Sequence, residues 1–425
     1  MRIVMVGNFG LWYKGTMGSR ALPMARALAA RGHSVSMIVP PWDDPIQSGI
    51  EQQIDGVRVV NVKLPPRVPF LWHGLLTVAL LLRTLREPAD VVHVFKPKAY
   101  AGLVQMAYVL LRRLRLLDVR IVLDTDDWEG KGGWNDLESF PALVKWLIAW
   151  HERWGLLHAD SITVASRELE SAALSIGVSQ NKVYYVPNGV WSLHSRGQGA
   201  STARATSPGG GEDCATRLDN GKVTSAAKCA ALLQSSPTIL LYTRFFEFKL
   251  DRVIDVLLSV RKRVPEAKLL VVGEGLNGEH EDFARLVENA GLERDVLHVG
   301  WVKASDLPEW FELADVAIYP MDDTLINRAK CPMKLVDLLS NGVPVVADRV
   351  GQVPEYVEDG VSGILVPPGD ATAFAQAVAE LLLDSDRRKA LGAEARERVL
   401  RVFDWDRLVD AVEAAYEIVS TDESG

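Results

Sequence analysis

The sequence has few cysteines and no hydrophobic stretch long enough to cross a membrane. Its 425 residues include three cysteines, and so sparse and odd a set does not form the disulfide framework of a small secreted domain. The longest apolar stretch, residues 70–82, is shorter than the ~20 residues of a spanning helix. The first residues lack the basic, apolar and small segments of a signal peptide. These absences predict a cytoplasmic chain.

An excess of positive charge is also absent. The net charge is −8, which argues against nucleic acid as the main partner. The charge is uneven, because residues 1–190 hold 21 Lys and Arg against 17 Asp and Glu, and the remainder holds 26 against 38. The basic half could face phosphates or anionic lipid, or the imbalance could be a chance feature of a solvated surface. Both readings stay open.

What the sequence does contain is typical of an α/β protein with two domains. A chain of this length exceeds one ordinary core, and short apolar, β-branched runs alternate with helical segments in both halves, which indicates parallel βαβ units. Residues 191–237 are rich in Ser, Gly, Thr and Ala and are predicted to be a flexible linker or insertion. The predicted strands are residues 3–6, 34–39, 91–95, 120–123, 161–165, 183–186, 238–242, 268–272, 296–299, 316–319, 343–347 and 364–366.

Two cations follow the first strand of the second half. Arg244 comes directly after that strand, and Lys249 lies five residues later at the predicted start of a helix. An Arg fork, a Lys point charge and free helix amides together suit a diphosphate. Alone, such a pair is more typical of a solvated surface, but open parallel sheets bind ligands beyond the carboxyl ends of their strands.

Glycines follow the next two strands. Gly273-Glu274-Gly275 would let the backbone approach a ligand closely, or would form a simple turn. Gly300-Trp301-Val302 could present backbone to a nucleobase edge, whereas the Trp301 side chain is more typical of core packing. The segment 329–347 is the strongest of the series. There Pro332 suits the first turn of a helix, and Asp337 lies one to two turns along it, where a carboxylate could accept both hydroxyls of a ribose.

The ordered set of these motifs resembles the large retaining glycosyltransferase family 4, of GT-B fold. The resemblance covers nearly the whole chain except residues 191–237. It implies two Rossmann-like domains that face a central cleft: an acceptor domain at 1–190 and a donor-nucleotide domain at 238–402. We also expect residues 403–425 to form a helix that crosses back to the first domain. The segments that carry the resemblance are 31–35, 90–93, 186–190, 244–249, 273–275, 300–302, 329–347, 352–355 and 363–370.

The resemblance assigns roles in the second half. Arg244 and Lys249 would be the catalytic cations that hold the donor diphosphate, and Asp337, which matches the second acid of the family's paired-glutamate motif, would bind the ribose. The first acid of that motif falls on Ala329, which leaves the donor sugar open. Lys330 and Lys334 of the Lys-x-Pro-x-Lys-Leu loop would then compensate as phosphate contacts. The expected donor-binding residues are Gly15, Gly273, Glu274, Gly275, Val302, Lys330, Cys331, Pro332, Met333, Lys334 and Asp337.

The residues that we expect to bind the acceptor lie in the first half of the chain. The loop 10–18, which contains Gly15, is a bulkier version of the family's glycine-rich loop. Many relatives have a histidine where Asp126 stands, so Asp126 or Asp127 would orient the acceptor or relay its proton as catalytic residues. Lys96 and Lys98 would meet an acceptor phosphate, or are two solvated lysines. His93 is predicted to be a packed core histidine.

The resemblance to this family implies a metal-independent hexosyltransferase, with polysaccharide biosynthesis as the pathway expected from the family. It would move a hexose-type sugar from a UDP- or GDP-linked donor to a glycan or lipid-linked acceptor, with no metal and no cofactor beyond that donor. The acids at 124–129 also look like a metal site, but GT-B enzymes usually need none. No carboxylate nucleophile is evident, so same-face attack with retention is favoured, the leaving diphosphate taking the acceptor proton.

Three further alternatives stay open. The chain could be an inactive sugar-nucleotide-binding or scaffold subunit, which the alanine at position 329 favours, or a sugar-nucleotide epimerase on the same fold. Residues 70–82 and 146–154 are apolar and Trp-rich and could lie in a bilayer interface at the inner face of the membrane. Core packing of the first domain explains these two segments equally well.

Overall fold

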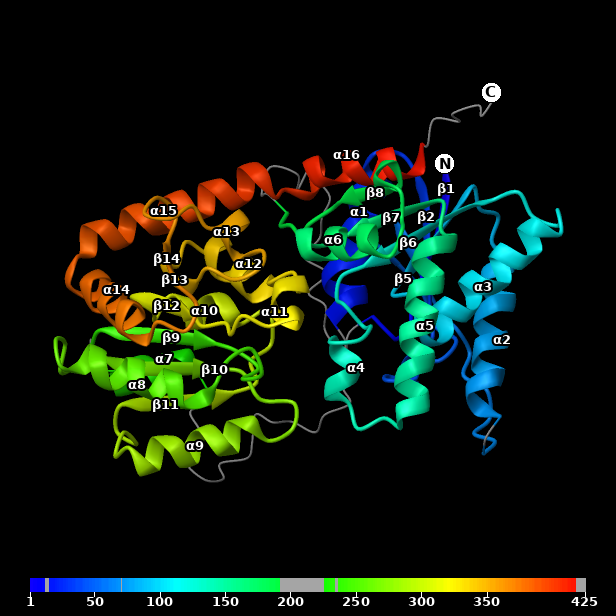
Figure 1. The fold of residues 1–425 in the computed structure, drawn as a ribbon. Coiled ribbons are helices and arrows are strands. Elements are labelled where there is room, and N and C mark those ends of the chain that lie inside the picture. Colours follow the sequence, from blue (N-terminus) through cyan, green and yellow to red (C-terminus); the bar gives the residue numbers. More distant parts are fainter. Residues whose placement is uncertain (12–14, 70, 192–224, 234–235, 418–425) are drawn as a thin grey trace. The chain divides into compact units, whose positions relative to one another are not determined.

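The chain folds into two compact units. The computed structural model describes residues 1–11, 15–69, 71–191, 225–233 and 236–417 (Figure 1). Within these ranges, unit 1 comprises residues 1–191, 329–331 and 403–417, and unit 2 comprises residues 225–328 and 332–402. Most of the predicted linker 191–237 lies outside the described residues, as do residues 12–14 of the predicted loop 10–18.

Unit 1 is built on an eight-stranded sheet with the order β3-β4-β2-β1-β5-β6-β7-β8. All neighbours pair in parallel except β3 and β4, which form an antiparallel hairpin at one edge. The strands are β1 Arg2–Val6, β2 Ser34–Val39, β3 Glu51–Ile54, β4 Val57–Asn61, β5 Val91–Phe95, β6 Arg120–Thr125, β7 Ser161–Val164 and β8 Val183–Tyr185. The helices are the π-helical turn η1 Met17–Ala21, α1 Leu22–Ala30, the short 3-10 turns η2 Pro45–Gln47 and η3 Gln180–Lys182, α2 Trp72–Leu85, α3 Ala99–Arg113, α4 Trp134–Leu137, α5 Ala142–His158, α6 Arg167–Ser175 and α16 Trp405–Tyr416.

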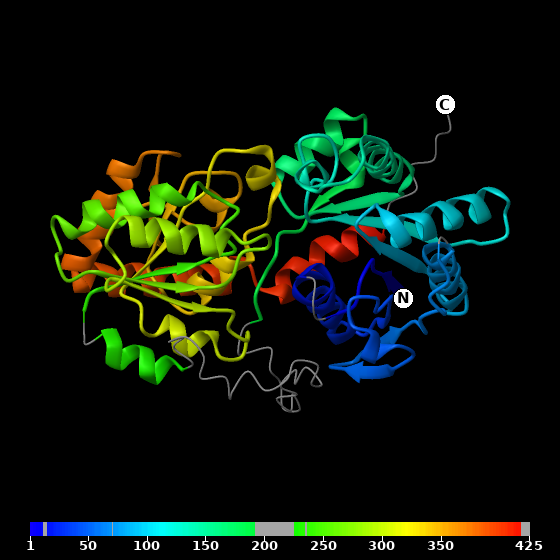
Figure 2. The ribbon, with the colours of Figure 1, turned by 90° about the horizontal axis from the view of Figure 1, so that it is seen from below.

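Helices cover both faces of this sheet. On one face α1 and α16 pack together over β1, β2, β4, β5 and β6, and Figure 2 shows these two helices, blue and red, side by side. Trp405 and Tyr416 of α16 are buried in that core. The other face carries α3, which contacts β5, β6, α2 and α5. Because helices cover both faces of the sheet, all five residues of β5 are buried.

Unit 2 is built on a fully parallel six-stranded sheet with the order β11-β10-β9-β12-β13-β14. The strands are β9 Thr238–Tyr242, β10 Lys268–Val272, β11 Val296–Gly300, β12 Val316–Tyr319, β13 Val345–Asp348 and β14 Ile364–Val366. The helices are α7 Ala226–Leu233, α8 Leu250–Arg261, α9 Glu279–Asn289, α10 Leu307–Phe311, α11 Leu325–Ala329, α12 Met333–Ser340, α13 Val353–Tyr356, α14 Ala371–Leu383 and α15 Ser385–Val402.

The main core of unit 2 lies between one face of the sheet and helices α8, α9 and α14. Side chains alternate along β9, so that Ile239 and Leu241 face this core. The strand order reverses at β9, whose neighbours are β10 on one side and β12 on the other. The chain therefore leaves β9 and β12 towards opposite sides of the sheet, and this switch point is where open α/β sheets bind ligands.

The predicted strands are confirmed, most of them to within two residues at each end. The β3–β4 hairpin was not predicted, because β3 is a polar edge strand with the sequence Glu-Gln-Gln-Ile. The short helix α11, Leu325–Ala329, was not predicted either. Pro332 does not lie in the first turn of α12; it is the capping residue just before it.

Candidate functional site

Arg244 lies on a tight turn that follows β9. The next residue, Phe245, has a left-handed backbone with a φ of 66°, and its N–H donates to the Thr243 hydroxyl at 2.7 Å. The Phe245 side chain is fully buried against Phe283, with ring centroids 5.4 Å apart. A non-glycine residue keeps this backbone only where its surroundings hold it. The buried Phe245 side chain therefore anchors the turn in the core. Arg244, the residue before it, is half-buried.

A buried carboxylate, Glu247, ties this turn to the rest of the site. Its Oε1 atom accepts a hydrogen bond from the Lys334 ammonium at 3.2 Å. Its backbone oxygen accepts two more hydrogen bonds, from Asp322 N at 2.9 Å and from Asn327 Nδ2 at 2.7 Å. The segment after β12 and the first turn of α12 are thus fastened to the segment after β9. Sequence reasoning missed Glu247, although an acid among the phenylalanines 245, 246 and 248 was a signal of a buried polar contact.

Asp337 lies on α12 beside the end of β9. Burial raises its pKa to about 7, and the nearby charge of Lys334 opposes that rise only partly. Among the described residues, no group donates a hydrogen bond to its carboxylate. Tyr242, at the end of β9, is close to two charged groups: burial and the Asp337 charge raise the Tyr242 pKa, and Arg244 lowers it. The charges of Arg244 and Asp337 therefore both reach Tyr242.

Replacing Asp337 by Asn should stabilise the fold above neutral pH. The folded-state pKa of about 7 lies above the ordinary value, so the ionised carboxylate costs folding free energy fully above pH 7, and the cost disappears as the pH falls through about 4. Because water screens a half-buried group, we expect a gain of about 1–2 kcal/mol at pH 8 and much less at pH 5. Thermal unfolding at both pH values measures it, with Asp255→Asn on the exposed face of α8 as the control. An equal gain at pH 5 would contradict the assignment.

The glycine turn after β10 packs against Thr243, the residue before Arg244. Gly273 has a φ of 123°, and a Cβ atom there would overlap the carbonyl oxygen of Thr243. Gly300, after β11, has a φ of 72°, and a Cβ there would come within 2.8 Å of Glu274 Oε1. Both positions therefore require glycine. The half-buried Val302 follows two residues after Gly300.

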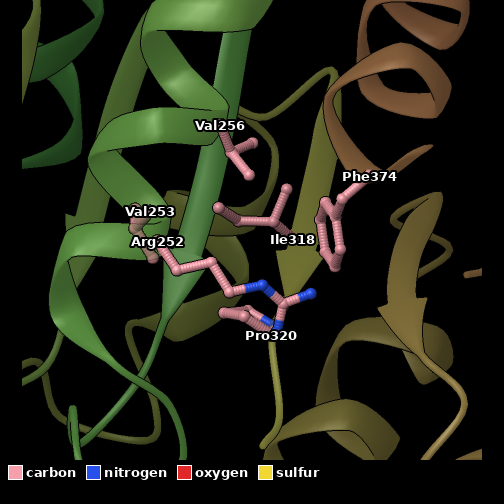
Figure 3. Close-up of a pocket in the computed structure, with 6 residues that line it drawn as sticks. All are labelled: Arg252, Val253, Val256, Ile318, Pro320 and Phe374. Carbon is pink, nitrogen blue, oxygen red and sulfur yellow. The ribbon is translucent and has the colours of Figure 1, made fainter. Parts of the chain in front are cut away.

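Lys249 caps the N-terminus of α8 and is exposed. Among the described residues it makes no ion pair. Deeper along the same helix, Arg252 forms two hydrogen bonds of 2.6 and 2.7 Å with the buried Asp348. Figure 3 shows Arg252 at a shallow hollow that is lined also by Val253, Val256, Ile318, Pro320 and Phe374. This hollow has no enclosed room even for a water molecule, so it does not hold a ligand.

In unit 1 the turn η1 carries a fully buried arginine. Arg20 donates two hydrogen bonds of 2.7 Å to Asp124 at the end of β6. Its third donor group reaches Val186 O at 2.8 Å and Asn188 Oδ1 at 3.0 Å. Burial opposes the charge of Arg20, but Asp124 holds its pKa above the ordinary value. The pair fixes the segment after β1 against the ends of β6 and β8.

The predicted acceptor lysines and catalytic acids of unit 1 form one cluster. The Lys96 ammonium lies 2.7 Å from Asp127 Oδ2 and 3.3 Å from both Asp126 Oδ1 and Glu129 Oε1. Lys98 pairs with Glu129 Oε2 at 2.6 Å. Lys96 is buried. Because carboxylates pair with both ammonium groups, neither Lys96 nor Lys98 carries an unpaired charge. Residues 96 and 99 adopt left-handed backbones, which turn the chain sharply at the end of β5.

The environments of Asp126 and Asp127 separate their pKa values. Burial acts to raise the pKa of Asp126, but the charges of Lys96 and Arg20 and a 2.7 Å hydrogen bond from Thr16 hold it below the ordinary value. Burial raises the pKa of Asp127, helped by the charges of Asp126 and Glu129, against the attraction of Lys96. Two neighbouring acids with separated pKa values are a common arrangement in acid–base chemistry.

Three other residues considered in the sequence, His93, Cys331 and Gly15, make hydrogen bonds within the fold. His93 is buried between Tyr416 and Thr163, at 2.8 and 3.2 Å, and burial lowers its pKa to about 3, which confirms a core histidine. Cys331 is buried and its sulfur accepts the Asn188 N–H at 3.2 Å. Gly15 is exposed, and its carbonyl accepts from the Ser19 hydroxyl at 2.6 Å. In the described parts of the chain, no group of three or more His, Cys, Asp or Glu is arranged to hold a metal.

Two sequence families match the two halves of the chain. "Glycosyl transferase 4-like domain" matches residues 15–189, and "Glycosyl transferases group 1" matches residues 236–384. Together they cover well over half of the sequence in the order of the two units. The chain belongs to the group 1 glycosyltransferases. Its fold is GT-B, as the resemblance implied.

Curated members of related families match part of the chain. It is 31% identical over 196 residues to N-acetyl-alpha-D-glucosaminyl L-malate synthase of Bacillus anthracis, covering 45% of this chain and 49% of the relative. It is 34% identical over 179 residues to a GDP-mannose-dependent alpha-(1-6)-phosphatidylinositol monomannoside mannosyltransferase of Mycobacterium tuberculosis, covering 41% and 46%. The chain thus spans about half the length of these curated relatives.

Solved structures share its fold along nearly the whole chain. Sucrose-phosphate synthase of Thermosynechococcus elongatus has a TM-score of 0.68 at 20% identity and covers 98% of both chains. Anabaena Alr3699/HepE in complex with UDP and glucose has a TM-score of 0.64 at 14% identity, covering 96% of this chain and 98% of its own. At such identities the likeness concerns the fold.

Proposed function

We propose that this chain transfers a hexose-type sugar from a nucleoside-diphosphate sugar to a hydroxyl of a glycan or lipid-linked acceptor. The observation that carries the proposal is the half-buried carboxylate of Asp337. It has no hydrogen-bond donor among the described residues, burial raises its pKa to about 7, and its charge, like that of Arg244, acts on Tyr242. An ionised acid held in this state needs a partner, and the two hydroxyls of a ribose supply it.

The donor diphosphate then meets the cations of unit 2. Arg244 stands on an anchored turn, and Lys249 is exposed at the start of α8, where free helix amides add further donors. Lys334 is held in place by Glu247, which offsets part of its charge, and it adds a weaker third cation. Cations that are fixed before the reaction stabilise the charge that grows on the leaving diphosphate. Because protein groups supply this charge, the proposed transfer needs no metal.

The acceptor hydroxyl is proposed to approach Asp127. Its side chain is the more exposed of the two neighbouring acids, at 21% against 10% for Asp126, and its pKa is the raised one. Asp126 is already engaged by Thr16 and Lys96. The lysines 96 and 98 are neutralised by carboxylates, so their proposed task is to fix these acids. We propose retention of configuration, with the leaving diphosphate accepting the hydroxyl proton.

The test is a panel of UDP- and GDP-linked sugars with neutral glycan and lipid-linked acceptors, read by mass spectrometry. Both nucleotides belong in the panel because a relative is named GDP-mannose-dependent and a structural neighbour was solved with UDP. The expected result is one transfer product, formed equally with EDTA present, in the anomeric form of the donor. A donor isomer as the only product would favour the epimerase alternative, and metal-dependent transfer would contradict the mechanism.

A second candidate is a subunit that binds a sugar nucleotide without transferring the sugar. Ala329 favours it, because this buried alanine stands where the family's motif has its first acid. Its backbone carbonyl accepts a hydrogen bond from the Ser166 hydroxyl at 2.6 Å. The backbone at this position therefore makes a structural contact. Tight binding of a nucleoside diphosphate with no product from any donor would support this candidate over transfer.

We also propose that unit 1 contacts an anionic membrane surface through α5. No helix in the described ranges combines the length and hydrophobicity needed to cross a bilayer. Yet Leu143, Trp146, Leu147 and Trp150 form an exposed apolar stripe on α5, with Leu143 67% and Trp146 61% exposed. The helix also carries Lys145 and an exposed Arg153, and its only acid, Glu152, is buried. Trp at an interface and basic residues near anionic head groups are typical of peripheral helices.

Vesicle flotation tests this contact. We expect the chain to float with vesicles containing phosphatidylglycerol, and the variant Trp146→Glu/Trp150→Glu to lose most of that binding. Leu383→Glu, at an equally exposed leucine of unit 2, is the matched control and should float normally. Self-association that disappears in the double variant, with no vesicle binding by the native chain, would identify the stripe as a contact between two copies instead.

A further inference from the structure

Trp301 is the feature that neither the sequence prediction nor the proposed mechanism uses. It was expected in the core, but it is 62% exposed on the segment after β11. Large aromatic side chains are mostly buried on average. The guanidinium carbon of Arg244 lies 5.3 Å from the centre of the Trp301 ring, within the 6 Å of a cation–π contact, for which Trp is the best partner.

The two residues meet across an intervening strand. Arg244 follows β9 and Trp301 follows β11, and β10 lies between these strands in the sheet. Neighbouring strands are ~4.8 Å apart, so the two backbones are separated by roughly twice that distance. The contact is possible because β10 ends in Gly273-Glu274-Gly275, where the only side chain is that of Glu274. Because the two glycines have no side chains, Arg244 and Trp301 can reach each other past the end of β10.

Both ends of the contact are firmly held. On one side, the left-handed Phe245 is buried against Phe283 and packs 5.7 Å from the ring of His298. His298 also lies 2.7 Å from Gly273 O through its Nε2 atom. On the other side, Gly300 accepts a 2.8 Å hydrogen bond from Gly273 N. The backbones that carry Arg244 and Trp301 are thus joined through the end of β10, and the indole limits the motion of the guanidinium.

We infer that Trp301 is a positioning residue that holds the Arg244 guanidinium in place before the donor diphosphate binds. The inference rests on the proposed function, since it assumes that Arg244 contacts the diphosphate. A long arginine side chain loses rotamer freedom when it binds, and a contact made beforehand lowers that cost. The indole would therefore increase affinity for the diphosphate without touching it.

The test compares a nucleoside diphosphate with its nucleoside. Affinities of the full chain for UDP, GDP, uridine and guanosine would be measured by calorimetry or competition. Trp301→Leu should weaken binding of the preferred nucleoside diphosphate about three- to tenfold, the range of an exposed to partly desolvated cation–π contact, and leave the nucleoside within twofold. Trp301→Phe should recover most of the loss. In the Arg244→Ala background, Trp301→Leu should have no further effect.

The controls separate two kinds of failure. Leu383→Ala removes an equally exposed apolar side chain of unit 2 and should change neither affinity. If Trp301→Leu weakens the nucleoside as much as the diphosphate, the indole stacks on the base and the inference is wrong. Additive losses in the double variant would overturn it too. If Arg244→Ala itself leaves diphosphate affinity unchanged, the proposed donor site is what fails.

Discussion

Arg244→Ala and Lys249→Ala should each lower the turnover number of sugar transfer by about 100-fold or more while the fold stays intact. The reason is that both cations would act on charge that develops as the glycosidic bond to the diphosphate breaks. Removing one preorganised donor from such a site costs about 10²–10³ in rate. Turnover of the best donor–acceptor pair from the panel measures the effect, with circular dichroism as the check on folding.

The chain offers matched controls for both variants. Lys262 ends the same helix that Lys249 begins, and it is exposed, so Lys262→Ala should transfer sugar at the native rate. Lys249→Arg keeps the charge and should retain part of the activity. Turnover near the native value in both alanine variants would remove Arg244 and Lys249 from the mechanism, whatever the affinity for the nucleotide.

Arg20→Leu should destabilise unit 1 by about 3–5 kcal/mol, because it leaves the Asp124 carboxylate buried and unpaired. Both side chains of this ion pair are fully buried. Chemical unfolding followed by circular dichroism measures the loss. We expect the double variant Arg20→Leu/Asp124→Leu to be less destabilised than Arg20→Leu alone, since it removes both charges together.

The exposed pair of Arg2 and Asp90 provides the comparison for this prediction. Its side chains are 56% and 40% exposed, and an ion pair in water contributes about 0–1 kcal/mol. Arg2→Ala should therefore shift the unfolding midpoint only slightly. A loss of the same size in Arg2→Ala and Arg20→Leu would show that burial of the Arg20–Asp124 pair is not what makes it costly to break.

The strands were predictable because parallel strands covered on both faces leave a plain signal. Residues 91–95 and 268–272 are short runs made mostly of Val, Leu and Phe, and the structure has strands with those bounds. The β3–β4 hairpin left no such signal, since an edge strand that faces water needs no apolar residues. Helix α11 is five residues long, which is too short for a 3.6-residue periodicity to be recognised.

The candidate site was predictable residue by residue but not as an arrangement. Spacing along the chain pointed to Lys96 and Lys98 and to Asp126 and Asp127 as separate features. Their pairing depends on the alignment of β5 with β6, where Phe95 stands opposite Asp124, and the sequence does not contain that register. For the same reason Trp301 was expected in the core, because its contact with Arg244 spans three strands. The catalytic and binding roles of these residues stay predictions.

Helix α16 has a consequence for the order in which the protein is made. Trp405 and Tyr416 belong to the core of unit 1, although all of unit 2 up to residue 402 precedes them in the chain. A ribosome therefore finishes unit 2 while the face of unit 1 that α16 covers is still bare. Proteins usually complete their N-terminal domain first during synthesis. Here the N-terminal unit is complete only when α16 has been made, and nascent chains should depend on chaperones for longest at the surface formed by α1, β6, β7 and β8.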